Sequence, residues 1–224
     1  MPRQTVLDQP DVADLTLSAA MRVGSQAEHQ EAEDSSFMSE LLGGRVNEQG
    51  YADYLLRLRT VYDALEETVR AHLDQPAVAA VHDTALERLD AIDADLDHWC
   101  PDATRTVDSP AAHAYRARLV AAGDWSGLLV AHHYTRYLGD LSGGQAIGRI
   151  LDRTFGLDGQ GVAFYAFPEI EKPKVYKDGY RARLDALGMS GDDQERVVAE
   201  VKVAFRMNQA LFAELGTNLP AYAR

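Results

Sequence analysis

Hydrophobic residues recur every three to four positions along most of this chain, which is the period of amphipathic helices. Asn47 is a good helix-capping residue and precedes the clearest stripe, and Pro76 predicts where that helix ends. Ser190 is a second capping residue, and it precedes the last helix. The first stripe consists of Tyr51, Tyr54, Leu58, Tyr62, Leu65 and Val69, and the last consists of Val197, Val201, Phe205, Asn208, Phe212 and Leu215.

The same period predicts five more helices. Ser109 and Pro110 are a cap followed by a first-turn proline, and Gly123 closes the helix that they open. Gly156 is placed to end the longest helix. The five helices are expected at residues 15–33, at a segment with Leu86, Leu89, Ile92 and Leu96 that stops before Pro101, and at residues 109–123, 125–155 and 175–187.

Strand patterns are almost absent, so the fold class is all-α. Residues 156–174 are the least regular part, and residues 164–168 predict an extended connector. We expect one multi-helix domain over residues 13–216, with a disordered tail at residues 1–12 and a short tail at residues 217–224.

Glycine is concentrated at one place inside the longest predicted helix. Gly139, Gly143 and Gly144 lie within six positions, and together they weaken a helix by roughly 3 kcal/mol relative to alanine. Gly139 and Gly143 share one face, and Asp140 follows Arg136 by one turn. The glycines indicate either a close helix–helix crossing or a backbone surface against a flat ligand.

Composition limits the other possibilities. The 224 residues suit one domain, and the formal charge of −13 argues against nucleic acid and anionic membranes as partners. No apolar run is long enough to span a bilayer, and the first residues do not have the pattern of a signal peptide. Cys100 is the single cysteine, which fits a reducing compartment. We expect a cytoplasmic protein without membrane insertion.

Residues 134–145, YTRYLGDLSGGQ, resemble the distal helix of the haem oxygenases. His29 and Glu33, followed by Phe37 and Met38, are similar to the segment around the proximal haem ligand in that family. The resemblance extends from about residue 17 to 215, and its main departure is Glu28 beside the ligand position. No hydrophobic anchor follows Leu215, so the chain resembles the soluble, bacterial-type members. The family fold places haem between a proximal helix and a glycine-bent distal helix.

The resemblance assigns His29 as the axial ligand of the haem iron. Glu33, one turn later, can engage the second ring nitrogen and fix its tautomer. Exposed Lys172, Lys174 and Arg183 are expected to be solvated charges. The haem propionates are expected to bind Arg22, Tyr134, Lys177 and Arg181, and the haem-binding set is completed by Met38, Ser142, Gly144 and Phe205.

On the other side of the haem, the resemblance implies that Asp140 holds water near bound dioxygen. Asn208 supports this independently, because a polar amide in an apolar stripe needs buried partners. The catalytic set is then Tyr62, Thr135, Arg136, Gly139, Asp140, Gly143 and Asn208.

The implied reaction is oxidative cleavage of haem, as substrate and cofactor, at the α meso carbon, with dioxygen, to biliverdin, carbon monoxide and ferrous iron. The sequence has no flavin or NAD fingerprint, so the expected electron donor is a ferredoxin, a flavodoxin or a reductase. A non-catalytic haem carrier or sensor is the main alternative, although it would need neither Asp140 nor the glycines. A thiaminase-like hydrolase or a di-iron oxygenase has weaker support, from Cys100 and from the pair Asp95 and His98.

Overall fold

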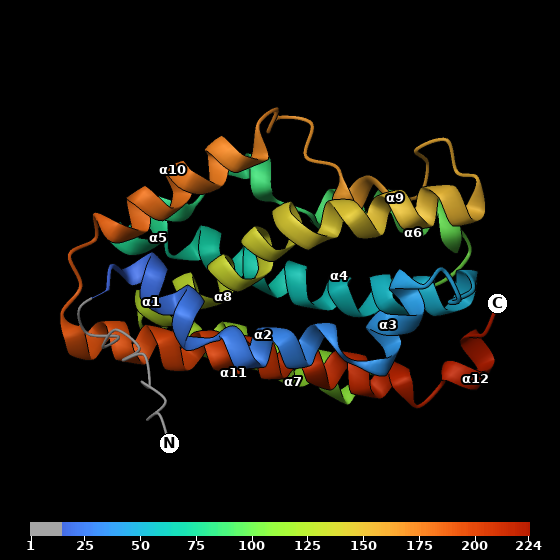
Figure 1. Ribbon diagram of the computed structural model, residues 1–224, viewed down its shortest axis with the longest axis horizontal. Coiled ribbons are helices and arrows are strands. Elements are labelled where there is room, and N and C mark those ends of the chain that lie inside the picture. The colour runs from blue at the N-terminus through green and yellow to red at the C-terminus, as the bar shows by residue number, and fades with distance from the viewer. Residues whose placement is uncertain (1–14) are drawn as a thin grey trace, which may run out of the picture.

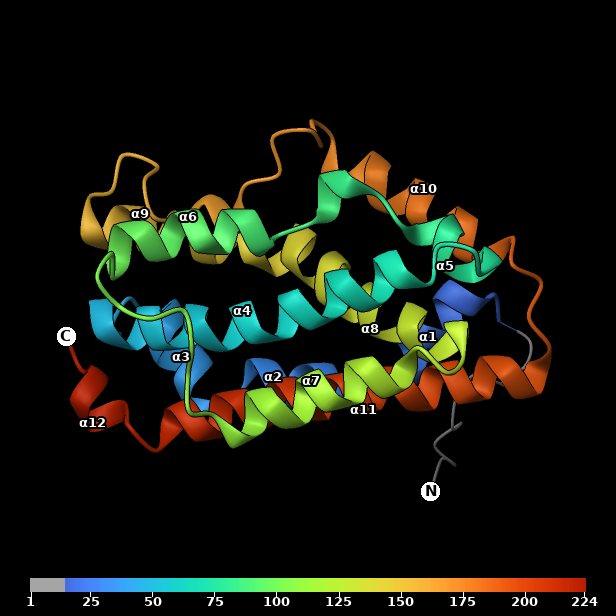
Figure 2. The same ribbon diagram turned by 180° about the vertical axis from the view of Figure 1, so that it is seen from behind.

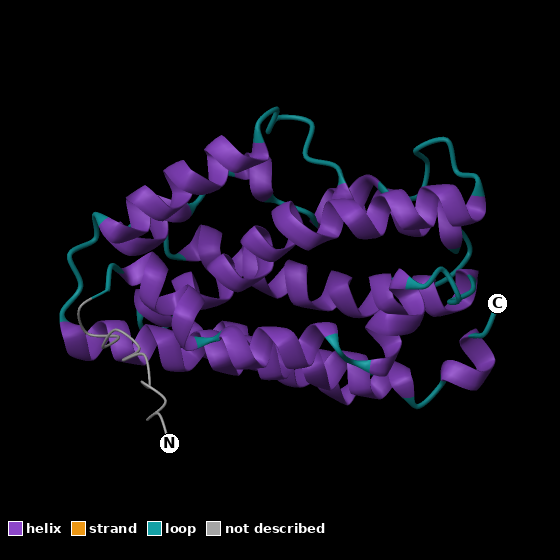
Figure 3. Cartoon of the chain, viewed as in Figure 1, coloured by secondary structure: helices purple, strands orange, loops and turns teal. Residues whose placement is uncertain are grey.

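The computed structural model describes residues 15–224, and the tail predicted at residues 1–12 lies outside them. Helices and loops make up this part of the chain, as predicted (Figure 3). None of the helices described is long and apolar enough to cross a membrane. The α-helices are α1 (Leu17–Gly24), α2 (Gln26–Glu33), α3 (Ser36–Leu42), α4 (Glu48–Ala71), α5 (Pro76–Val81), α6 (Leu89–Trp99), α7 (Pro110–Ala122), α8 (Ser126–Gly139), α9 (Gln145–Phe155), α10 (Pro173–Asp185), α11 (Gly191–Gly216) and α12 (Leu219–Tyr222).

The helix α4 runs through the middle of the molecule (Figures 1 and 2). It packs against α6 on one side and α7 on the other, while α11 packs along α8 and α2. The buried faces of these helices form one continuous core. At the C-terminal end, α12 packs against α4 and buries Tyr222.

Four of the predicted helix ends are confirmed by their capping residues. The side chain of Asn47 accepts a hydrogen bond from the Gly50 N–H at 3.0 Å, so α4 begins as expected. Ser109 and Ser190 cap α7 and α11 in the same way. Gly156 adopts φ = 65° after the last turn of α9, a left-handed conformation that favours glycine.

Several of the predicted segments differ from the structure. Leu86, expected on the same helix as Leu96, lies in a 3-10 turn, Thr84–Leu86, before α6 begins. The expected first helix is two helices, because the chain breaks at Ser25, whose hydroxyl donates to the Met21 carbonyl at 2.7 Å. Pro76 does not end a helix but begins α5 as its first residue, since α4 has already ended at Ala71. The segment expected to be an extended connector contains a 3-10 turn, Ala163–Tyr165. The short helices α3 and α12 were not predicted.

The longest predicted helix is also interrupted. Between α8 and α9 the backbone forms a π-helical turn, η3 (Asp140–Gly144), at the place where glycine is concentrated. A π turn inserts an extra residue into the helical repeat and turns the side chains that follow it. The axis therefore changes direction between α8 and α9 (Figure 1).

A buried ionic cluster joins three of the long helices. The Arg118 Nε donates to Glu200 at 2.7 Å, and His132 Nε2 lies 2.7 Å from the same carboxylate. Burial alone would raise the pKa of Glu200, but the hydrogen bonds from His132 and Arg118 lower it to about 2. The cluster ties α7 and α8 to α11.

We expect Glu200→Gln to lower the free energy of unfolding at pH 7 by on the order of 2 kcal/mol, because hydrogen bonds to a charged acceptor are lost. The folded pKa of about 2 lies below the ordinary 4.5, so this stabilisation is complete above about pH 4.5 and disappears as the pH falls toward 2. Urea unfolding of the wild type and of Glu200→Gln at pH 7 and pH 3 measures this difference in the free energy of unfolding. Glu195→Gln, an exposed change on the same helix, is the control; equal stabilities at pH 7 would contradict the prediction.

Candidate functional site

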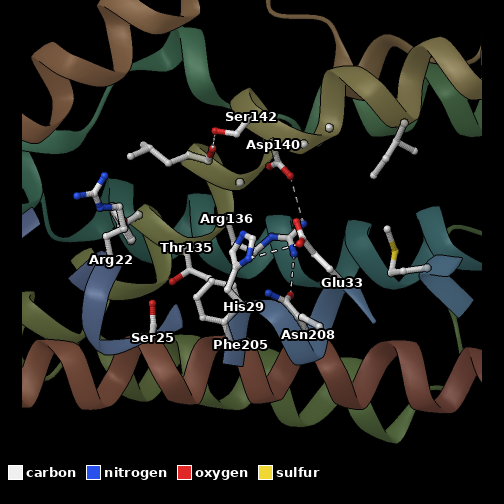
Figure 4. A pocket seen from close by; sticks show the side chains of 18 of the residues that line it. Arg22, Ser25, His29, Glu33, Thr135, Arg136, Asp140, Ser142, Phe205 and Asn208 are labelled. Atoms are coloured by element: carbon white, nitrogen blue, oxygen red, sulfur yellow. Dashed lines mark hydrogen bonds and ion pairs between the residues drawn. The ribbon is translucent and has the colours of Figure 1, made fainter. Parts of the chain in front are cut away.

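A cavity of about 710 Å³ lies between α2 and the π turn (Figure 4). Its walls come mainly from three segments that are far apart in the sequence: α1 with α2, α8 with η3, and α11. Tyr62 and Lys177 are the two predicted residues outside its lining. The other predicted residues all line it: Arg22, His29, Glu33, Met38, Tyr134, Thr135, Arg136, Gly139, Asp140, Ser142, Gly143, Gly144, Arg181, Phe205 and Asn208.

One wall carries His29 on α2. Its imidazole packs edge-on against the ring of Phe205, with 5.4 Å between ring centroids, and its side chain is 53% exposed. The Nδ1 atom lies 3.7 Å from the Glu33 carboxylate, which is ion-pair distance but longer than a hydrogen bond. The ring is therefore positioned by packing on α11 and remains accessible from the cavity.

Glu28, the unusual neighbour of His29, faces cations on α11. Its carboxylate lies 3.8 Å from the Lys202 ammonium and 3.9 Å from the Arg206 guanidinium. Gln209 also donates to its backbone carbonyl at 3.0 Å. The charge of Glu28 is thus balanced by α11, and these contacts hold α2 against that helix.

The opposite wall is the glycine-rich backbone of α8 and η3. A Cβ atom built on Gly139 or Gly143 would meet nothing within 4 Å, so both residues leave open space in the cavity. Gly144 differs, because a Cβ atom there would lie 3.1 Å from the ring of Tyr165. Gly139 and Gly143 therefore expose their backbone to the cavity, and Gly144 allows Tyr165 to pack closely against the turn.

Asp140 belongs to a buried polar network behind this wall. The Tyr62 hydroxyl donates to its carboxylate, and the Arg136 Nε donates to the Tyr62 oxygen at 3.1 Å. Arg136 also donates to the Asn208 side-chain oxygen at 2.7 Å and lies 3.6 Å from Asp140. The polar residue in the last apolar stripe, Asn208, therefore has a buried partner, as its type requires.

Burial raises the pKa of Asp140 above its ordinary 3.8, although the nearby Arg136 and Tyr62 act in the opposite direction. Burial also raises the pKa of Tyr62 well above 10, so its hydroxyl keeps its proton. Thr135 donates to the Ala131 carbonyl at 2.8 Å, which leaves its oxygen lone pairs as acceptors. The network thus places the Asp140 carboxyl group and the Thr135 hydroxyl oxygen at the lining of the cavity.

Cationic side chains lie at the outer edge of the cavity. Arg22 and Arg181 line it, and both lower the pKa of the buried Tyr134, against the larger effect of burial, which raises it. Lys177 donates to the Ser142 hydroxyl at 2.8 Å and so joins α10 to the π turn. Although a helix break separates Arg22 from His29, both still face the same cavity.

Several lining residues were not predicted as part of the site. Tyr54 has the spacing of an ordinary core residue, and Phe164 and Tyr165 lie in the irregular connector, where periodicity gives no information. The unpredicted lining residues are Val23, Ser25, Gln26, Ala32, Tyr54, Leu138, Ile147, Phe164, Tyr165 and Phe212.

Comparisons with known proteins point to one family. The heme oxygenase family model matches residues 15–214. The chain is 37% identical to a heme oxygenase of Porphyra purpurea over 91% of this chain and 88% of the relative. It is 38% identical to heme oxygenase 1 of a Nostoc species over 91% of this chain and 87% of the relative.

Solved structures are similar as well. Heme oxygenase-2 from Synechocystis, in complex with heme and NO, superposes with a TM-score of 0.88 at 32% identity, covering 92% of this chain and 88% of that one. Heme oxygenase-1 from the same organism, in complex with heme, gives 0.87 at 34% identity, with coverages of 92% and 95%. These matches do not favour a non-catalytic carrier, and the family predicted from the sequence is confirmed. The chain therefore belongs to the heme oxygenase family of enzymes.

Proposed function

We propose that this cavity binds haem between α2 and the π turn and that the protein cleaves it oxidatively to biliverdin, carbon monoxide and ferrous iron. The observation that carries the proposal is the pairing of one accessible imidazole, His29, with the open backbone of Gly139 and Gly143 across a cavity of about 710 Å³. An imidazole supplies an axial nitrogen, and a bare backbone surface accommodates a flat ring.

His29 is the proposed axial ligand, and Glu33 orients it through the second ring nitrogen. Haem, when bound, supplies both the iron that binds dioxygen and the meso carbon that is oxidised. Met38, Phe205 and Gly144 complete its apolar surroundings, and Ser142 lies at its edge. The bare backbone of Gly139 and Gly143 would leave room for haem and its oxygen ligand at this wall, because no side chain occupies that space.

The proposed role of Asp140 is to hold a water molecule that delivers protons. Tyr62 and Arg136 fix the carboxylate, and Asn208 fixes Arg136 in turn. Since burial raises the pKa of Asp140, its carboxyl group takes up a proton more easily than an exposed one. Thr135 contributes an acceptor oxygen beside this water.

The direct test is to add haem and either ascorbate or a reduced ferredoxin system to the protein. We expect the Soret band to disappear and a bilin to form. A carrier would retain the Soret band under the same conditions, which would contradict the proposal.

Electrons must then come from a separate donor, for which we propose a ferredoxin, a flavodoxin or a reductase in the cytoplasm. The free thiol of Cys100 is consistent with that reducing compartment. The identity of the donor is tested by comparing turnover with each class of protein at equal concentration.

Arg22, Lys177 and Arg181, with Tyr134, are proposed to bind the haem propionates and to set which meso carbon faces the reacting oxygen. We predict the α isomer of biliverdin from the wild type. Arg181→Glu should reduce the α fraction, because a negative charge repels the propionate that it should bind. Chromatography of the product measures both results; a dominant β or δ isomer from the wild type would show that the propionates are misplaced.

A further inference from the structure

His133 and Tyr180 form a buried pair between α8 and α10. The His133 Nδ1 and the Tyr180 hydroxyl are hydrogen-bonded at 2.8 Å, and the two rings stack with 5.7 Å between centroids at 14°. Both residues are buried, with 2% and 0% of their surfaces exposed. Burial lowers the pKa of His133 to about 3, so the imidazole is neutral and the bond joins two uncharged groups.

The helix on the outer side of this pair, α10, carries the cations of the haem edge. Tyr180 lies next to Arg181 in the sequence and one turn from Lys177. The other polar contacts of α10 reach other elements: Asp185 accepts from Ser18 on α1, and Tyr176 donates to Asp83 at 2.8 Å. Arg183 donates to the Ala80 carbonyl on α5, and Lys177 donates to Ser142 in the π turn. The contact between Tyr180 and His133 is therefore the buried polar contact that ties α10 directly to α8.

On its inner side, His133 continues into the network around Asp140. Its ring packs edge-on against Tyr137 at 4.5 Å, and Tyr137 packs against Tyr62 at 5.8 Å. Tyr62 donates to Asp140. A continuous line of buried rings thus connects the helix that carries Arg181 to the carboxylate of Asp140.

We infer that His133 and Tyr180 are positioning residues that fix α10 relative to α8, and thereby the in-plane rotation of haem relative to Asp140. The inference rests on the proposed function, because Arg181 and Lys177 act on haem only if they bind its propionates. It goes further by assigning the choice of meso carbon partly to a buried contact that does not touch haem.

The test is the isomer ratio of the product from variants of this pair. Tyr180→Phe removes one hydroxyl, and His133→Leu removes the ring nitrogens. We expect each variant to lower the ratio of the α isomer to the other isomers by about fivefold. This change corresponds to the net free energy of one hydrogen bond. His133→Asn should restore much of the ratio, because its amide places a polar atom near the position of Nδ1. The double variant should equal either single one, since both lose the same bond.

Tyr222→Phe is the matched control. It also removes a buried, hydrogen-bonded tyrosine hydroxyl, but on α12, away from the cavity lining. It should destabilise the protein without changing the isomer ratio. Hydrogen exchange of the haem-free protein provides a second measurement, in which Tyr180→Phe should accelerate exchange in α10 selectively.

Wild-type isomer ratios from both Tyr180→Phe and His133→Leu would overturn the inference, as would unchanged exchange in α10. Arg181→Glu tests the proposed function separately. If Arg181→Glu changes the isomers while the buried-pair variants do not, propionate binding stands and the positioning role of the pair fails.

Discussion

His29→Ala should fold and bind haem but lose nearly all bilin formation. The walls of the cavity and its cationic edge remain, while the proposed axial nitrogen is absent. We expect turnover to fall by more than about 100-fold, because loss of even an outer-shell partner of a metal ligand lowers affinity or activity by about 10–100-fold. The absorption spectrum of the haem complex should also change, since the strong axial field is lost.

Added imidazole should restore part of this activity. The side chain of His29 is 53% exposed, so removing it leaves a space that a small molecule can reach from the cavity. His113→Ala, an exposed change on α7, is the control and should behave as the wild type. An unchanged haem spectrum with full turnover in His29→Ala would show that another group ligates the iron.

The prediction of His29 from sequence illustrates what local patterns can provide. One histidine among seven cannot be selected by spacing alone, and the resemblance of its segment to a known family made the choice. The packing that positions its ring, against Phe205 on α11, joins residues from opposite ends of the described chain. Periodicity along one helix contains no information about such a contact.

Helices were predicted better than their interruptions. Capping residues such as Asn47 and Ser190 act within one turn, so the sequence determines those boundaries directly. The break at Ser25 depends on a side chain bonding to the preceding turn, and serine occurs in helices as well as at their ends. The irregular segment around Phe164 follows neither the helical period nor the alternation of a strand. Its position is set by tertiary contacts such as the packing of Phe164 on Tyr62.

The glycine concentration was the most informative local feature, but its geometry required the structure. The glycines alone favoured a helix crossing and a ligand surface equally, and the resemblance of the whole segment favoured the ligand surface. The open space at Gly139 and Gly143 is consistent with a ligand surface, whereas Gly144 packs against Tyr165 as in a close crossing. The two interpretations therefore apply to different glycines, Gly139 and Gly143 on one hand and Gly144 on the other, where α8 meets the π turn.

Asp140→Ala should retain haem binding and lose ring cleavage. The carboxylate lies in the distal network rather than at the His29 wall, so its removal leaves the proposed iron ligand and the cationic edge intact. Without the water that it holds, proton delivery should fail, and general acid–base groups contribute about 10²–10⁴-fold to rate. Haem titration should therefore give a wild-type affinity, while the rate of bilin formation falls by a factor in that range.

Asp140→Asn and Tyr62→Phe separate charge from geometry. Asparagine keeps hydrogen-bonding capacity at the same position but cannot take up a proton as a carboxylate does, so we expect an intermediate rate. Tyr62→Phe removes the hydroxyl that links Asp140 to Arg136 and should lower the rate less than Asp140→Ala, because the carboxylate itself remains. In Asp140→Ala, which no longer cleaves haem, we expect peroxidase-like oxidation of an added phenol in place of bilin formation. If Asp140→Ala forms biliverdin at the wild-type rate, the proposed proton delivery is wrong, and the π turn serves only to shape the cavity.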